Sequence, residues 1–324
     1  MAAVKVIRAE LANQEQFVTM FADEARILSR LDHPNISRTL EVGHRAHLAF
    51  IAMEVLLGRT LEDVWEAAKS AGVAFPFDLA AWISAQVARG LHYAHELNDE
   101  DGLSLHLIHR DVNPSNIFLT YDGAIKLFDF GLAKVKGRRH HTQSGVVKGK
   151  VPYLSPEQLL QLPLDRRSDM FSLGTTLWEL TTMTRLFKRA TDLGTIFAIR
   201  DGVVPDPTLT APHYPPALWT IVARALAANR DERYATAVEL ADELEAFALG
   251  HGDGGLSTMV GTFLDRLFPG ERSKQTAWLA RAATLPAKAN AVTMVPPAPI
   301  VSLAEAPIPK ADASTPLLLV HKKH

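Results

Sequence analysis

The chain of 324 residues carries 34 basic and 36 acidic residues, and its formal net charge is −2. This balance argues against nucleic acid or a membrane surface as the main partner. No cysteine is present, which excludes disulfide bonds and thiolate metal sites. No apolar run reaches the length of a membrane span and no signal peptide opens the chain, so we expect a soluble, cytoplasmic protein.

The first part of the chain favours a small β-sheet with one helix. Residues 2–8 (AAVKVIR) are typical of a strand, and residues 13–31 place apolar side chains near helical spacing. The sequence His33-Pro34-Asn35 ends this helix, because proline cannot continue it. Residues 36–43 and 47–55 then predict two strands joined by a short polar turn.

Helical patterns dominate the remainder of the domain. A long helix is expected over residues 78–98, and the patterns from about 165 to 248 are all helical. Between them, Asp122-Gly123 is a hairpin turn signal that joins strands over Ile117–Thr120 and Ala124–Phe128.

These patterns predict an α+β domain over residues 1–250, with a small sheet lobe (1–56) and a larger, mainly helical lobe (57–250). Residues 256–284 carry an apolar stripe and predict a helical extension, which either packs back on the helical lobe or binds a partner protein. Residues 285–324 are rich in alanine and proline without periodicity, so we expect a disordered tail.

Three polar residues lie at a spacing that suits phosphoryl transfer. Transfer from a nucleotide needs metal ions to neutralise the phosphates, a lysine on the phosphates and a carboxylate that orients the attacking hydroxyl. Asp111 and Asn116 share one predicted loop, and Asp129 follows the next pair of strands. Asn116 and Asp129 can supply oxygen ligands to magnesium, which leaves Asp111 to accept the hydroxyl proton.

The ordered motifs HRD (109–111), Asn116, DFG (129–131) and SPE (155–157) resemble those of the eukaryotic-like serine/threonine protein kinases of bacteria, and the resemblance covers about residues 2–248. It implies a two-lobed protein-kinase-like fold with a truncated N-terminal sheet lobe, ATP and Mg²⁺ as cofactors, and a serine or threonine hydroxyl of a protein as substrate. It also implies roles at the nucleotide: a phosphate-binding Lys5, its partner Glu24, a gatekeeper Met53, and a hinge from Glu54 to Leu56 that meets adenine.

Taken singly, residues such as Lys5 and Glu24 also have plainer interpretations, as an exposed strand lysine and a solvated helix residue. Their order along the chain gives weight to the resemblance. The residues that it assigns to the framework are an internal hydrophobic column of Leu28, His109 and Phe130, an ion pair between Glu157 and Arg233, and a brace of the catalytic loop, Asp169.

The glycine-rich hairpin of that family has no counterpart in this sequence. The family places two strands and a G-x-G-x-x-G turn before the lysine strand, and here only four residues precede Lys5. We therefore expect an open nucleotide site and an unpaired sheet edge at the lysine strand, where a partner protein could dock. Either the sequence starts late, through a wrongly chosen start or a truncated gene, or the chain is a degenerate kinase.

Two further positions depart from the family pattern. Asn113 stands where the family usually has a lysine that contacts the transferred phosphate, and Lys150 stands where it usually has a threonine. These positions are neighbours in the family. Our hypothesis is that the Lys150 ammonium replaces the missing lysine beside Asp111, and the alternative is that Lys150 points to solvent.

The segment between DFG and SPE resembles an activation segment. Arg110 could pair with a phosphate added there, and the candidate acceptors are Thr142 and Ser144. The basic residues 138–141 beside them are either extra phosphate partners or a solvated loop.

Three functions are consistent with the sequence. The first is a protein serine/threonine kinase regulated through its activation segment, and the second is a pseudokinase that acts as a binding or scaffold protein. A small-molecule kinase is the third, and SPE and RRSDMFSLG argue against it because they resemble the branch that acts on proteins.

Overall fold

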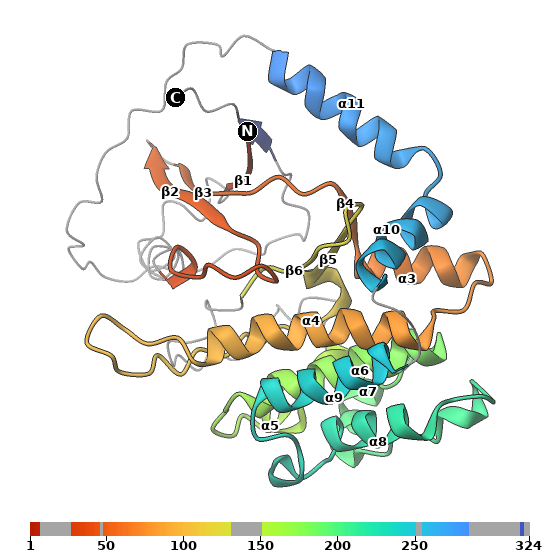
Figure 1. Cartoon of the computed structure of the whole chain (residues 1–324). Helices are drawn as coiled ribbons and strands as arrows, with labels where there is room; N and C mark the ends of the chain where they lie inside the picture. Colours follow the sequence, from red (N-terminus) through yellow and green to blue (C-terminus); the bar gives the residue numbers. More distant parts are fainter. Residues whose placement is uncertain (7–26, 46–47, 131–150, 251–254, 285–317, 321–324) are drawn as a thin grey trace.

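The computed structural model describes residues 1–6, 27–45, 48–130, 151–250, 255–284 and 318–320. A β-sheet forms one part of the molecule, and a larger group of helices lies on the other side of the long helix α4 (Phe77–His95) (Figure 1). This arrangement confirms the predicted α+β class with a small sheet lobe and a mainly helical lobe. None of the described helices is both long enough and apolar enough to cross a membrane.

The sheet of the N-terminal lobe has the strand order β2-β3-β1-β7. β1 (Ala2–Val6), β2 (Thr39–Arg45) and β3 (Leu48–Met53) pair antiparallel, and the register places Lys5 opposite Ile51. Val4 lies opposite Ala52, and both are buried, so this face of the sheet is apolar and the chain that precedes the lysine is fixed by pairing on β3.

The lysine strand does not form an unpaired edge, which corrects our expectation. β7 (Leu318–Val320) pairs antiparallel with β1, from Ala2 opposite Val320 to Val4 opposite Leu318. The strand comes from the tail that we expected to be disordered over residues 285–324. The outer backbone groups of β1 need partners, and a short run of leucine and valine favours the extended conformation.

A second sheet carries the predicted hairpin. β4 (Gly58–Thr60), β5 (Ile117–Thr120) and β6 (Ile125–Leu127) pair antiparallel, with Ile117 opposite Leu127. The Asp122-Gly123 turn is confirmed, and Gly123 adopts a φ of 91°, which glycine tolerates without strain. The hairpin brings the residues just before β5 next to those just after β6.

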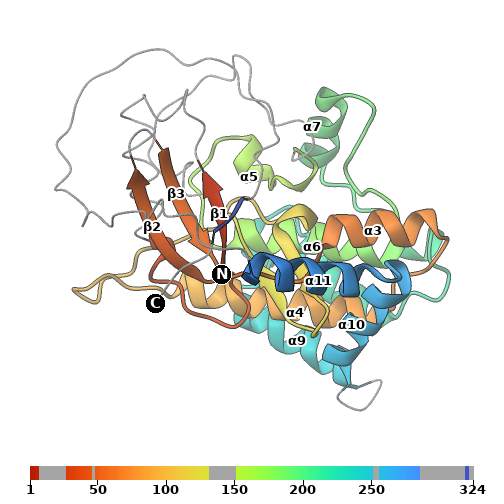
Figure 2. The same ribbon diagram turned by 90° about the horizontal axis from the view of Figure 1, so that it is seen from above.

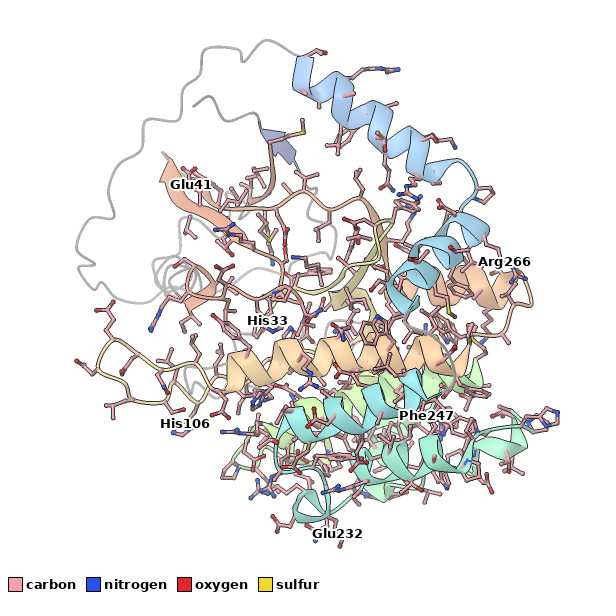
Figure 3. All side chains as sticks on the ribbon, in the orientation of Figure 1. His33, Glu41, His106, Glu232, Phe247 and Arg266 are labelled. Carbon is pink, nitrogen blue, oxygen red and sulfur yellow. The ribbon has the colours of Figure 1, made fainter. Side chains whose placement is uncertain are left out.

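The helical lobe is built around α4, whose sides pack against α9 (Ala237–Leu249) and α6 (Arg167–Thr182) (Figure 2). Almost every residue of α6 is buried, which marks it as the central helix of the lobe. Near the sheet, the His33 ring stacks on Tyr93 of α4 at 5.1 Å between centroids (Figure 3). The other helices of this lobe are α3 (Leu61–Ser70), α5 (Pro156–Leu159), α7 (Asp192–Asp201) and α8 (Pro216–Ala225), with 3₁₀ turns at Pro114–Asn116, Val151–Tyr153, Pro207–Leu209 and Arg230–Glu232.

The predicted helical extension forms α10 (Leu256–Leu267) and α11 (Glu271–Thr284). α10 packs back on the domain, and its Phe263 ring lies 4.9 Å from the ring of Phe75. α11 is attached through polar contacts at its first turns. The Gln275 side chain bonds both the N–H and the C=O of Gly58, at 3.0 and 3.2 Å. Glu271, the first residue of α11, forms an ion pair with Arg59, in which Oε2 lies 2.7 Å from Nη2.

Gly261 sets the distance between α10 and the hairpin. A β-carbon at this position would lie 2.5 Å from the carbonyl oxygen of Tyr121. Replacing Gly261 with valine is therefore expected to lower the free energy of unfolding by about 1–3 kcal/mol through overpacking. Thermal or denaturant unfolding checks this, with Thr262→Val on the exposed side of α10 as the control. Equal stability of both variants would show that α10 does not rest on the hairpin.

Candidate active site

The loop that carries HRD is held at its start by a buried carboxylate. The backbone N–H groups of His109 and Arg110 each donate to Asp169 at 2.8 Å, one to each carboxylate oxygen. His95 Nε2 lies 2.8 Å from the same side chain. Burial alone would raise the pKa of Asp169, but the hydrogen bond from His95 and the charges and backbone around it outweigh this and lower the pKa. Asp169 therefore stays ionised and braces the loop, as predicted.

The His109 ring has a defined tautomer. Its Nε2 lies 3.1 Å from the carbonyl oxygen of Phe128, which can only accept, so Nε2 carries the proton. Its Nδ1 accepts from the N–H of Asp111 at 3.2 Å. The ring is fully buried, and this burial lowers the pKa of His109 despite the surrounding carboxylates. A neutral His109 thus links the start of the loop to the segment before DFG.

The predicted hydrophobic column is present in part as ring packing. The His109 and Phe130 rings lie 4.4 Å apart between centroids, and Phe130 belongs to the buried core. Leu28 packs against that core as a partly buried side chain. Leu28 therefore packs on the same core as Phe130, and the ring contact between Phe130 and His109 extends this packing to the catalytic loop.

The loop then folds over Asp111 through two asparagines. Asn116 Nδ2 donates to the carbonyl oxygen of Asp111 at 2.8 Å and to its Oδ2 at 2.9 Å. Asn113 Nδ2 donates to the same carbonyl at 2.7 Å, and its Oδ1 accepts from Ser115 N at 3.0 Å. The amide nitrogen of Asn116 is thus directed at Asp111, and its amide oxygen is the atom that can face a cation.

Asn113 is a buried turn cap, which explains its presence at this position. Its side chain is 2% exposed and caps the 3₁₀ turn Pro114–Asn116. Replacing Asn113 with alanine is expected to lower the free energy of unfolding by about 0.5–2 kcal/mol, the range for a lost cap. Asn113→Asp keeps the acceptor for Ser115 N and should recover part of this loss. Chemical denaturation of the wild type and the two variants measures these differences. A free energy of unfolding that is unchanged in Asn113→Ala would contradict the capping role.

The lysine and the DFG aspartate meet across the two lobes. Lys5 Nζ lies 2.6 Å from Asp129 Oδ1, and both side chains are partly exposed. The N–H of Phe128 donates to the carbonyl oxygen of Asn116 at 3.1 Å, so Asp129 directly follows a residue bonded to Asn116. The three residues that we predicted for phosphate and metal contacts therefore converge, although they come from three separate segments.

Two residues of this site have strained backbones. Arg110 has a φ of 64° and Asp129 a φ of 56°, in the left-handed region that non-glycine residues rarely adopt. Such conformations persist where the surroundings hold them in place, and they concentrate at functional sites.

A cleft opens beside these residues between the sheet and the DFG segment. It is lined by Lys5, Met53 and Asp129, together with apolar side chains that include Leu28, Ile51 and Phe130. Met53, the predicted gatekeeper, is part of this lining. Glu54 and Leu56 do not line this cleft; they follow β3, and the N–H of Glu54 donates to the carbonyl oxygen of Arg38 at 3.0 Å. The Glu54 amide is therefore already bonded, and the roles of Glu54 and Leu56 at adenine stay predictions.

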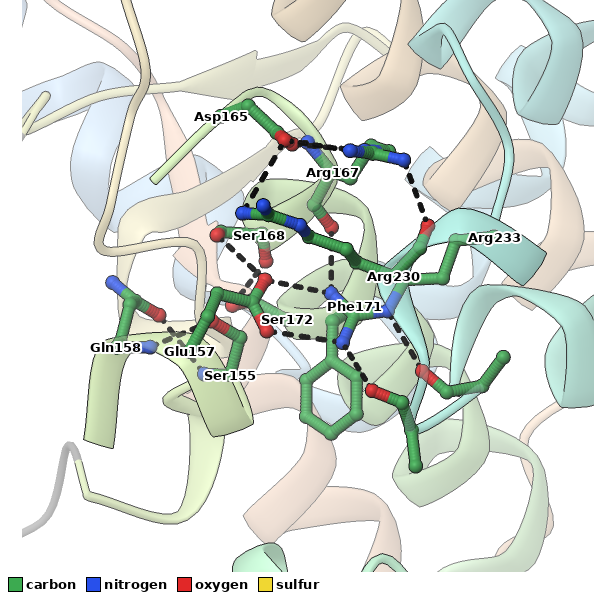
Figure 4. Close-up of polar contacts among 12 residues, drawn as sticks. Ser155, Glu157, Gln158, Asp165, Arg167, Ser168, Phe171, Ser172, Arg230 and Arg233 are labelled. Carbon is green, nitrogen blue, oxygen red and sulfur yellow. Dashed lines mark hydrogen bonds and ion pairs between the residues drawn. The ribbon is translucent and has the colours of Figure 1, made fainter. Parts of the chain in front are cut away.

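The predicted pair of Glu157 and Arg233 is confirmed (Figure 4). Arg233 Nη1 and Nη2 donate to the two carboxylate oxygens at 2.7 and 3.0 Å. Ser168 Oγ adds a third hydrogen bond at 2.7 Å, and both charged side chains are buried. This bidentate pair fastens the end of the SPE segment to the helical lobe.

A second ion network, partly buried and centred on Arg185, was not predicted from the sequence. Its Nη1 lies 2.9 Å from Glu179 Oε2, and its Nη2 lies 2.5 Å from Glu62 Oε1. Its guanidinium covers the Trp65 ring at 3.8 Å from the centroid, and Tyr153 Oη donates to Glu179 at 2.8 Å. The network joins α3 and α6 to the turn that contains Tyr153. No local sequence pattern predicts this network, because its members are far apart in sequence.

Several predicted residues lie outside the described residues. They are the lysine partner Glu24, the substitute cation Lys150, the candidate phosphorylation sites Thr142 and Ser144, and the basic residues 138–141. Their roles stay predictions.

The donor set at the site is suited to magnesium. Mg²⁺ is usually held in proteins by one or two carboxylate or amide oxygens together with phosphates and water. The Asn116 amide oxygen and the Asp129 carboxylate would provide such ligands. Within the described ranges no group of three or more histidine, cysteine, aspartate or glutamate side chains could hold a metal ion by itself.

Comparison with known proteins shows the family to which this chain belongs. The protein kinase domain model matches residues 1–243, and the chain belongs to the protein kinase family. Its fold resembles the crystal structure of the PknI kinase domain of Mycobacterium tuberculosis, with a TM-score of 0.55 and 26% identity over 75% of this chain and 84% of that one.

Curated relatives are similar over most of this chain. Tyrosine-protein kinase MasK of Myxococcus xanthus is 38% identical over 88% of this chain and 44% of its own length. Serine/threonine-protein kinase PknL of M. tuberculosis is 35% identical over 76% of this chain and 59% of its own length. The chain therefore spans about half the length of these relatives. The similarity to MasK covers more than the 243 residues of the domain match, so it continues into the helical extension.

Proposed function

We propose that this chain is a protein kinase that transfers the γ-phosphate of ATP, with Mg²⁺, to serine or threonine hydroxyls of proteins. The observation that carries the proposal is that two bonded pairs lie side by side. Lys5 and Asp129 meet at the cleft, and Asp111 and Asn116, bonded to each other, are joined to the residue before Asp129 by the bond from Phe128 N to the Asn116 carbonyl. The same residue types in the same order provide the phosphate, proton and metal contacts that phosphoryl transfer needs.

Each residue of the candidate site has a defined task in this proposal. Lys5 binds the phosphates, and the Glu54 carbonyl and Leu56 amide meet adenine beside Met53. Asp111, oriented by the Asn116 amide nitrogen at 2.9 Å, accepts the proton of the attacking hydroxyl. Asn116 and Asp129 would hold Mg²⁺, which neutralises phosphate charge when bound.

The names of the relatives differ in the amino acid whose hydroxyl is phosphorylated. PknL and a Clostridium perfringens relative, 32% identical over 75% of this chain, are named serine/threonine kinases, whereas MasK is named a tyrosine kinase. We favour serine and threonine because the motif order resembles that branch. Regulation by phosphate on Thr142 or Ser144, paired with Arg110, and a cytoplasmic location that supplies ATP belong to the same proposal.

The test is a phosphorylation assay on the chain as it stands. The protein is incubated with ATP and Mg²⁺ or with ATP and EDTA, and its intact mass and that of a general acceptor protein are recorded. Mass gains of one phosphate that require Mg²⁺ and disappear in Asp129→Asn support the proposal. Fragmentation then assigns the acceptor residues. Phosphate found only on tyrosine would overturn the serine/threonine assignment, and no gain on any acceptor would overturn the activity.

A pseudokinase is the second function that the sequence allows. The convergent site residues give it no comparable support in the described part of the chain, so we do not propose it.

A further inference from the structure

Gln158 connects the end of the SPE segment to the catalytic loop. It is the third residue of α5, and its side-chain Oε1 accepts from the N–H of Ser155 at 2.9 Å. Its Nε2 donates to the carbonyl oxygen of Arg110 at 3.0 Å. The first bond belongs to a capping box, in which Ser155 Oγ accepts from Gln158 N at 3.3 Å in return (Figure 4). The second bond has no part in capping the helix.

The bond to Arg110 lies at a point where the backbone needs support. Arg110 is in the left-handed region with a φ of 64°, which costs free energy for a side chain of this size. Its N–H is held by Asp169 Oδ1 at 2.8 Å, and its C=O is held by Gln158 Nε2. The peptide groups on both sides of Arg110 are therefore fixed, and the second of them is the one that leads directly into Asp111.

We propose that Gln158 is a positioning residue for Asp111, which acts by holding the carbonyl of Arg110. This inference rests on the proposed function, because Asp111 has to be the residue that accepts the hydroxyl proton. It goes beyond that function in linking the placement of the SPE segment to the direction of the catalytic side chain. When α5 is seated by the Glu157–Arg233 pair, the Gln158 amide is brought to the loop; when α5 is displaced, the loop loses this donor.

The plainer interpretation of Gln158 is a helix cap alone, and one substitution separates the two. Glutamate serves as well as glutamine at the third position of a capping box, so Gln158→Glu keeps the acceptor for Ser155 N. It removes the donor to Arg110 and places an anionic oxygen against a carbonyl oxygen. Gln158→Met is a neutral second variant of similar length. It removes the donor to Arg110 without adding charge, and it also removes the acceptor for Ser155 N, so it is compared with a variant that weakens the cap alone.

Steady-state kinetics and backbone hydrogen exchange form the test. Loss of a well-aligned hydrogen bond at the reacting group is expected to lower kcat about tenfold in both variants, with the KM for ATP unchanged. Amide exchange in the peptide that spans residues 107–113 should become faster. The control is Ser155→Ala, which weakens the cap but leaves the Gln158 donor in place, and it should keep kcat within about twofold of the wild type.

Two results would overturn the inference. The first is a kcat in Gln158→Glu and Gln158→Met that matches that of Ser155→Ala. The second is unchanged exchange over residues 107–113 in proteins that remain folded by thermal unfolding. If the wild type itself does not transfer phosphate, the proposed function fails, and the exchange comparison alone then supports or overturns the role of Gln158 in holding the loop.

Discussion

Replacing Asp111 with asparagine is expected to lower kcat by about 10²- to 10⁴-fold, the range that a positioned general base contributes. Asparagine has nearly the same shape, and it can still accept from Asn116 Nδ2 through its side-chain oxygen, as Asp111 Oδ2 does at 2.9 Å. What it loses is the carboxylate that takes the proton of the attacking hydroxyl. Because Lys5 and Asp129 are untouched, the dissociation constant of Mg²⁺-ATP should change little.

The measurements are kcat on an acceptor protein and nucleotide binding by titration. Asp101→Asn is the matched control, since it makes the same change of charge on an exposed loop that precedes HRD. A variant at Asp111 that keeps the wild-type kcat would show that another group accepts the proton. A variant that loses nucleotide binding to the same extent as kcat would show that Asp111 acts on the bound ATP.

The second large effect is on stability, and it concerns Arg233. Its side chain is fully buried against a carboxylate that is 6% exposed. Arg233→Met leaves Glu157 charged and without this partner inside the protein. We expect the free energy of unfolding at pH 7 to fall by about 3–5 kcal/mol, the usual result of breaking a buried ion pair from one side. The double variant Glu157→Gln/Arg233→Met should recover much of this loss, because no buried charge remains.

The pH dependence of this effect has a defined sign. Burial alone would raise the pKa of Glu157, but the hydrogen bonds and charge of Arg233 outweigh it and lower the pKa in the folded protein. The pair therefore contributes stability above the unfolded pKa of about 4.3, and this contribution is lost as the pH falls through the lowered folded value. Denaturant unfolding from pH 7 to pH 3 should show the wild type and Arg233→Met converging. A gap that stays constant would mean that Glu157 ionisation does not underlie it.

Local signals in the sequence were sufficient for the elements that frame the site. The Asp122-Gly123 turn identified the hairpin, because its backbone conformation requires glycine. The predicted helix before Pro34 lies mostly outside the described residues, and its last helical residue in the described part is Leu28. The placement of Asp111, Asn116 and Asp129 around that hairpin then followed from the short chain segments between them, and Glu157–Arg233 came from the resemblance to the kinase family.

Contacts between distant side chains were not accessible in this way. His95 lies at the end of a helix that was predicted, yet its bond to Asp169 depends on how α4 and α6 pack. Serine followed three residues later by glutamine marks a capping box, so the sequence indicates one of the two contacts of the Gln158 side chain. The pattern predicts the cap, but it does not predict that Nε2 of the same side chain donates to the Arg110 carbonyl. The Arg185 network had no local signal, and the three residues of β7 do not indicate by themselves that they pair with β1.

The β1–β7 ladder has a consequence for how the protein folds. It joins residues more than 300 positions apart through three residue pairs, so a very long loop is closed by few backbone hydrogen bonds. The entropy lost on closing a loop rises with its length, and contacts of high sequence separation form slowly. This strand should therefore join the sheet last and leave it first, in local opening events that spare the core around α4 and α6. The β1–β7 ladder is therefore expected to be the least protected part of this sheet.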